Sequence, residues 1–143
     1  MNDAGAREWE NRLATQATIL LVEDEEGIRF MVKMFLEQSG YSVIEAENGA
    51  NALAIWEKKQ SEIDLVLADL VMPNGFTGQR LARRFQVDRP DLKVIFSSGY
   101  DCEDFADNEG ERLVPDSNFL RKPYRLSSLV QMIGESLRVK KAA

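Results

Sequence analysis

The chain is predicted to fold as one α/β domain in which helices cover both faces of a parallel sheet. From Thr18 to the end of the 143 residues, short apolar runs alternate with segments of helical periodicity, and this alternation is typical of a doubly wound sheet. The length suits a single domain with its own core. A second observation concerns function, because several apolar runs end in charged or hydroxyl-bearing side chains. Open sheets of this class place their ligand sites there.

Five strands are expected, because five short runs are rich in apolar residues and are bounded by turn residues. They lie at residues 18–22, 41–45, 65–68, 93–96 and 118–120. Four helices are expected where apolar residues recur every three or four positions. These positions fall within residues 28–36, 52–56, 81–85 and 126–137. The first helix should end at Ser39-Gly40, where the glycine can serve as a C-cap.

Three segments lie outside this regular pattern. Residues 1–17 are polar and are expected to form an N-terminal arm or linker, although Trp9 and Leu13 are spaced as an apolar pair on a helix. The domain itself is expected at residues 18–138, followed by a C-terminal tail at 139–143. The stretch Asp101–Ser117 is crowded with acidic residues, so a short helix followed by an irregular loop is expected there.

The composition argues against several classes of protein. The net charge of −6 disfavours nucleic-acid binding, because phosphate backbones attract basic surfaces. No apolar stretch has the length of a membrane span, and the first residues lack the apolar core of a signal peptide, so no membrane contact is expected. Cys102 is the only cysteine, which excludes an internal disulfide and fits a reducing, cytoplasmic location. The oligomeric state is left open.

The chain contains no histidine. This excludes Ser-His-Asp hydrolysis, histidine-ligated zinc and histidine general-base catalysis by these residues. It also means that the chain cannot donate a phosphoryl group from a phosphohistidine of its own.

Reactive side chains follow four of the apolar runs: Glu23 and Asp24, then Asp69, Ser97 and Lys122. Because parallel strands end at one edge of a sheet, these groups should converge. Two carboxylates about 4 Å apart repel each other by roughly 4 kcal/mol at an effective dielectric of about 20, and a divalent cation would turn this repulsion into binding. Oxygen ligands favour Mg²⁺. The pattern indicates metal-assisted phosphoryl chemistry, with Asp69 as the nucleophile, Lys122 neutralising charge and Ser97 hydrogen-bonding a phosphoryl oxygen.

Each of these residues also has a purely structural interpretation. Asp69 can cap a turn, and the acidic pair after the first strand can cap the first helix. Lys122 can be a surface charge and Ser97 a strand-end residue. For Phe119, an aromatic residue in the expected fifth strand, an ordinary core role and a functional role are equally favoured. The functional interpretation is favoured, because the structural one needs four coincidences at a single edge.

Four motifs together resemble the receiver domains of two-component response regulators. They are Leu21-Val22-Glu23-Asp24-Glu25, Asp69-Leu70-Val71-Met72-Pro73, the hydroxyl of Ser97, and Lys122-Pro123-Tyr124. The resemblance covers about Thr18 to Leu137 and implies a flavodoxin-like sheet of strand order 2-1-3-4-5. It further implies a signalling phosphoprotein rather than an enzyme. Such a domain accepts a phosphoryl group, with Mg²⁺, from the phosphohistidine of a sensor histidine kinase or a histidine phosphotransfer protein, and then changes its output face.

The resemblance also implies individual roles. Asp69 is the phospho-acceptor, Lys122 contacts the phosphate and Ser97 is the switch hydroxyl. Phe119 stands at the position of the switch aromatic, and Pro123 is expected to follow a cis peptide bond. The metal is expected to be held by Glu23, Asp24, Asp69 and the backbone carbonyl of Val71.

Two features refine the comparison with the family. The loop at 73–78 is one residue longer than the common Met-Pro-x-x-x-Gly form, and together with Ser97-Ser98-Gly99-Tyr100 it is more like the receivers of hybrid sensor histidine kinases. Only six residues follow Leu137, so we expect either a single-domain regulator or the receiver of a hybrid kinase.

Two other functions stay open. One is a phosphatase of the haloacid-dehalogenase kind, which also uses an aspartate nucleophile but usually has a second aspartate two residues later, where this chain has Val71. The other is a non-phosphorylated interaction module of the same fold. If the chain is phosphorylated, the acyl phosphate is expected to be long-lived, because neither Val71 nor Gly99 offers a polar side chain to orient a hydrolytic water.

Overall fold

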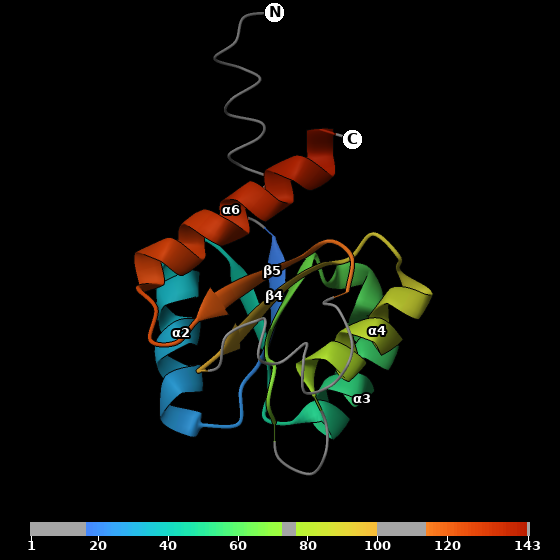
Figure 1. Cartoon of the computed structure of the whole chain (residues 1–143), viewed down its shortest axis with the longest axis horizontal. Coiled ribbons are helices and arrows are strands. Elements are labelled where there is room, and N and C mark those ends of the chain that lie inside the picture. Colours follow the sequence, from blue (N-terminus) through green and yellow to red (C-terminus); the bar gives the residue numbers. More distant parts are fainter. Residues whose placement is uncertain (1–16, 73–76, 100–113, 143) are drawn as a thin grey trace, which may run out of the picture.

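The computed structural model describes residues 17–72, 77–99 and 114–142. Within these ranges five parallel strands form one sheet in the order β2-β1-β3-β4-β5 (Figure 1), which confirms the predicted strand order. The strands are β1 (Thr18–Val22), β2 (Ser42–Ala46), β3 (Leu65–Asp69), β4 (Lys93–Ser98) and β5 (Ser117–Arg121).

Four α-helices and one short 3₁₀ helix accompany the sheet in the described part of the chain. They are α2 (Glu26–Gln38), α3 (Gly49–Lys59), η1 (Gln60–Glu62), α4 (Gly78–Asp88) and α6 (Leu126–Ala142). Helices α2 and α6 cover one face of the sheet, and α3 and α4 cover the other (Figure 1). The doubly wound class is therefore confirmed. None of these helices combines the length and the apolar character that crossing a bilayer requires.

The helices begin and end where local chemistry favours it. The side chain of Asn48 accepts a hydrogen bond from the backbone N–H of Asn51 at 2.7 Å and so caps α3. Thr77 caps α4 in the same way, through the N–H of Arg80 at 3.1 Å. A cap of this kind typically contributes about 1 kcal/mol. Gly40, just past the end of α2, has a φ of 101°, a conformation that glycine adopts without steric cost.

The sheet separates two hydrophobic cores, because successive side chains of a strand point to opposite faces. Along β1, Leu20 belongs to the core under α3 and α4, whereas Ile19 belongs to the core under α2 and α6. In the first core the rings of Trp56 and Phe85 stack with their centroids 4.3 Å apart. Burying a large apolar side chain completely is worth roughly 1.5–3 kcal/mol, so both faces contribute to holding the sheet in place.

The strands align so that their carboxyl ends form a single edge. Val22 of β1 pairs with Ala68 of β3, and Asp69 at the end of β3 pairs with Ser97 of β4. On the far side of β4, Ser98 pairs with Arg121, the last residue of β5. The residues that follow these strands therefore emerge side by side.

The strands differ slightly from their predicted bounds. β3 extends to Asp69 and β4 to Ser98, because the ladder continues through the hydrogen bond from the N–H of Leu70 to the carbonyl of Ser97 at 2.9 Å. Polar side chains thus occupy the last positions of both strands, although the apolar runs predict that the strands end at residues 68 and 96. β2 lies one residue later than expected, and β5 gains one residue at each end.

The last helix is longer than predicted, and several segments of the chain lie outside the described residues. Helix α6 continues to Ala142, so residues 139–142, assigned to a tail from the sequence, continue the last helix. The arm at 1–16 and the expected helix within 101–113 lie outside the described residues, as do four residues of the loop at 73–78. The described chain resumes at Val114, which is buried.

Candidate functional site

The carboxyl edge of the sheet brings the predicted reactive side chains together. Nζ of Lys122 lies 2.8 Å from Oδ1 of Asp69 and 3.2 Å from Oε1 of Glu23. The hydroxyl of Ser97 donates to the same Oδ1 of Asp69 at 2.9 Å. Lys122 and Ser97 thus approach one oxygen of a carboxylate whose residue is only 5% exposed.

Asp69 is held by the element that follows it as well as by its strand. The N–H of Gly78, the first residue of α4, donates to the carbonyl of Leu70 at 2.9 Å. A β-carbon at position 78 would overlap the carbonyl oxygen of Asp69. The start of α4 therefore packs directly on the backbone of Asp69, and only glycine allows this approach.

The acidic pair is anchored mainly through Glu23. Its N–H donates to the carbonyl of Ala46 at 3.1 Å, and its Oε2 accepts from the N–H of Glu25 at 3.2 Å. Asp24, by contrast, is exposed at the rim. Glu23 is thus a fixed, buried carboxylate, and Asp24 is the carboxylate that solvent or an ion can approach.

Three carboxylates form a group that can hold a metal ion. One oxygen each from Glu23, Asp24 and Asp69 lies within 4.8 Å of the other two. Ligands about 2.1 Å from an octahedral Mg²⁺ lie about 3–4 Å apart, and Mg²⁺ usually keeps several waters. A modest inward movement, or one bridging water, brings this set to that geometry, and an all-oxygen donor set fits Mg²⁺.

The charges in the site perturb one another. Burial raises the pKa of Glu23 above its ordinary value of 4.5, and the hydrogen bond and negative charge of Asp69 raise it further, against the opposing Glu25 N–H and Lys122. Burial acts to lower the pKa of Lys122, but contacts with Asp69 and Glu23 outweigh it and raise that pKa. Lys122 therefore stays protonated and offsets part of the repulsion among the carboxylates.

These groups line an open pocket of about 200 Å³. Its wall also includes Val71, Ser98 and Gly99. Val71 is 53% exposed, and its backbone forms an isolated bridge with Thr77. The pocket is polar and open to solvent, and Asp69 is part of its lining.

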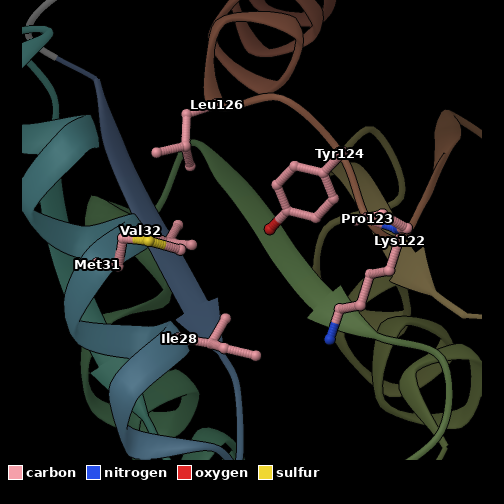
Figure 2. A pocket seen from close by; sticks show the side chains of 7 residues that line it. All are labelled: Ile28, Met31, Val32, Lys122, Pro123, Tyr124 and Leu126. Carbon is pink, nitrogen blue, oxygen red and sulfur yellow. The ribbon is translucent and has the colours of Figure 1, made fainter.

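A second, apolar pocket of about 340 Å³ adjoins the first and shares Lys122 with it. Figure 2 shows Ile28, Met31 and Val32 of α2 on one side, Tyr124 on the other and Leu126 at the upper end. Met31 has the three-to-four-residue apolar spacing that predicts a buried helix face, yet it is 51% exposed, next to Phe30 at 61%. Helical spacing could not reveal this groove, because the same apolar positions serve both core and surface.

Two residues expected to matter lie at the margin of the site. The peptide bond between Lys122 and Pro123 is cis. Phe119 is partly buried and packs against the core under α3 and α4, a position that fits either a core aromatic or a switch residue.

A doubly wound sheet with three carboxylates, a hydroxyl and a lysine at its carboxyl edge is typical of α/β domains that carry out phosphoryl chemistry. Comparison with known proteins agrees with this class. The sequence model of the response regulator receiver domain matches residues 19–134. The chain belongs to this family, whose members act in two-component signalling.

Individual relatives agree with this assignment. The chain is 41% identical over 127 residues to the sensor kinase CckA of Brucella abortus and 38% identical over 120 residues to the receiver protein CpdR of the same organism. These alignments cover 87% and 83% of this chain, but 13% of CckA and 95% of CpdR. The chain therefore resembles only a small part of the kinase but nearly the whole of CpdR.

Solved structures support the same conclusion. The receiver domain from the hybrid histidine kinase CckA has a TM-score of 0.71 at 31% identity, covering 85% of this chain and 99% of that one. A receiver domain protein from Clostridium thermocellum has a TM-score of 0.77 at 28% identity, covering 88% and 98%. The expected likeness to receivers of hybrid kinases is confirmed.

Proposed function

We propose that this receiver accepts a phosphoryl group on Asp69 from a phosphohistidine of a partner, with Mg²⁺ bound beside it. The observation that carries the proposal is the surrounding of one buried carboxylate: Lys122 at 2.8 Å, Ser97 at 2.9 Å and two further carboxylates within 4.8 Å. A structural cap would not need an ammonium group and a potential metal site around it. We assign the receiver to residues 18–138, with 1–17 as an arm or linker and with the last helix continuing beyond residue 138 to Ala142.

This geometry supports the proposed transfer. An oxygen of Asp69 forms a bond to phosphorus as the phosphorus–nitrogen bond of the phosphoimidazole breaks, and the electron pair of that bond stays on the imidazole nitrogen. Lys122 stabilises the negative charge on the phosphoryl oxygens, and the hydroxyl of Ser97 donates to one of them after transfer. Asp69 needs no general base, because it attacks as a carboxylate.

Glu23, Asp24, Asp69 and the carbonyl of Val71 are the residues that would hold Mg²⁺. When bound, the ion supplies positive charge against the transferred phosphoryl group and the carboxylates. The raised pKa of Glu23 supports this proposal, since a carboxylate kept in an unfavourable environment gains from a nearby cation.

The phosphohistidine has to come from outside these 143 residues, because they contain no histidine. We propose a sensor histidine kinase or a histidine phosphotransfer protein as donor. The apolar groove between α2 and Tyr124 reaches Lys122 (Figure 2), so a partner with an apolar helical surface can dock there and present its imidazole to Asp69.

Phosphorylation should alter the face around β4 and β5. A phosphoryl group adds charge and acceptor oxygens at Asp69, and Ser97 would turn towards them. Ser97 of β4 pairs with Leu120 of β5, and Phe119 precedes Leu120 on β5. We propose that this route couples the acceptor to the switch aromatic.

The test is radiolabelled phosphotransfer from a phosphorylated histidine kinase in the presence of Mg²⁺. The native chain and Asp91→Asn, an exposed aspartate at the opposite edge of the sheet, should be labelled, and Asp69→Asn should not. Equal labelling of Asp69→Asn and the native chain would refute the assignment. Turnover of a small phosphomonoester would instead favour the phosphatase alternative.

A further inference from the structure

Arg29, in the first turns of α2, contacts the backbone immediately before Asp24. Its Nη1 donates to the carbonyl oxygen of Glu23 at 2.8 Å, and its Nε lies 3.4 Å from Oε1 of Glu45 on β2. The side chain of Arg29 is only 14% exposed. A guanidinium held by two partners in fixed directions is well suited to orient a piece of backbone, because its donors form a rigid planar fork.

The carbonyl of Glu23 lies where the chain leaves the sheet. The N–H of Glu23 still donates to Ala46 of β2 at 3.1 Å, but β1 has ended at Val22 and the chain turns towards α2. A backbone carbonyl at such a position needs a donor from outside the strand ladder. Arg29 provides it from the helix that follows.

This contact controls more than one oxygen. The peptide unit from Glu23 to Asp24 is planar, so fixing its oxygen fixes the orientation of the whole plane. The side chain of Glu23 is held separately by the N–H of Glu25 and by Lys122. The direction in which Asp24 leaves that peptide therefore depends on Arg29.

We infer that Arg29 is a positioning residue for the divalent-cation site: it holds the Glu23–Asp24 peptide so that the Asp24 carboxylate faces Asp69, and Glu45 keeps its guanidinium in place. This inference rests on the proposed function, in which these carboxylates bind Mg²⁺.

The charge of Arg29 and its proposed positioning role predict opposite effects on metal binding. A cation near a metal site repels a divalent ion, so removing the charge of Arg29 should strengthen metal binding if charge is its only effect. If Arg29 positions Asp24, the same substitution should weaken binding. The direction of the change separates the two.

The experiment measures the dissociation constant of Mn²⁺ by the electron paramagnetic resonance signal of the free ion, with Mg²⁺ as competitor. The matched control is Lys33→Gln, which removes one positive charge from the same helix and breaks a 3.4 Å ion pair with Glu37. We expect Arg29→Gln to bind Mn²⁺ about tenfold more weakly, as loss of a residue behind a metal ligand usually does. Lys33→Gln should bind like the native chain or slightly more tightly.

Arg29→Lys should give an intermediate constant, because an ammonium group cannot keep both contacts at once. Thermal unfolding without metal shows whether each variant is folded. If Arg29→Gln is not folded, the Mn²⁺ dissociation constant of Arg29→Lys tests the inference instead. Binding by the folded arginine variants that equals or exceeds that of the native chain would overturn the inference. Failure of the native chain itself to bind Mn²⁺ would instead count against the proposed function.

Discussion

At the scale of single residues, the candidate site contains three carboxylates and one ammonium group. Lys122 contacts Asp69 and Glu23, and both of these acidic residues are 5% exposed. Their negative charges are therefore poorly screened by solvent. Without a cation, the carboxylates of the site are therefore expected to repel one another and to lower the stability of the domain.

Glu23 offers a direct measurement of this instability. Burial and Asp69 raise the pKa of Glu23 in the folded protein above 4.5, so folding favours the protonated side chain. The stability that this protonated side chain contributes is fully present below pH 4.5 and is lost as the pH rises through the raised value. Glu23→Gln should therefore raise the melting temperature of the metal-free protein at neutral pH, and the gain should disappear as the pH falls to 4. A melting temperature lowered at neutral pH would show that the contact with Lys122 outweighs burial.

Val71 bears on the lifetime of the proposed acyl phosphate. It lines the pocket and is 53% exposed, yet its side chain cannot hydrogen-bond a water. Val71→Asn should accelerate dephosphorylation by roughly ten- to a hundredfold, because a positioned polar group can orient the attacking water. The decay of labelled Asp69 over time measures this, with Val87→Asn on the exposed surface of α4 as control. Equal decay in all three proteins would contradict the prediction.

At the scale of elements, the start of α4 fixes the end of β3. Gly78 begins the helix and packs against the carbonyl of Asp69. The N–H of Gly78 donates a hydrogen bond to the carbonyl of Leu70. The helix is therefore held against the strand at the acceptor itself. A movement of α4 cannot leave the backbone of Asp69 unchanged.

Two glycine substitutions separate this close packing from helix propensity. Gly78→Ala should lower the free energy of unfolding by about 1–3 kcal/mol, because its methyl group overlaps backbone that cannot easily move. Gly27→Ala, in the first turn of α2 with open space around its β-carbon, should raise it by about 0.5–1 kcal/mol. Urea denaturation measures both. A Gly78→Ala protein as stable as Gly27→Ala would show that α4 does not press on Asp69.

At the scale of the whole molecule, the parallel sheet brings together residues that lie far apart in the sequence. Lys122 and Glu23 are 99 residues apart in sequence and form a contact of 3.2 Å. Both cores hold the strands in the register that makes this possible. Binding an ion at the edge should therefore stabilise the entire domain.

Mg²⁺ should raise the melting temperature through this linkage. At ten times its dissociation constant, an ion that binds only the folded state adds about 1.4 kcal/mol, or about 4 °C for a domain of this size. Asp24→Asn should lose most of this shift, whereas Asp91→Asn should keep it. Differential scanning calorimetry with and without Mg²⁺ makes the comparison. A full shift in Asp24→Asn would exclude that carboxylate as a ligand.

Much of the fold could be predicted, because its signals are local. The apolar run at Thr18–Val22 and the 3.6-residue spacing on the helices each depend on a few adjacent residues. Strand ends were less predictable, since Asp69 and Ser98 remain in the ladder for reasons that lie in the neighbouring strand. The groove at Met31 and the role inferred for Arg29 had no signal along the chain, because both depend on which residues another element brings close.

The amino-acid sequence by itself determined the class of the domain, the order of its elements and the identity of the reactive groups, since periodicity and motif chemistry are written in neighbouring residues. Only the tertiary structure decided which oxygen of Asp69 meets Lys122 and Ser97, how closely α4 packs on that residue, and which apolar side chains remain exposed beside the site. These depend on register and packing between segments far apart in the chain, where a shift of one residue changes every contact.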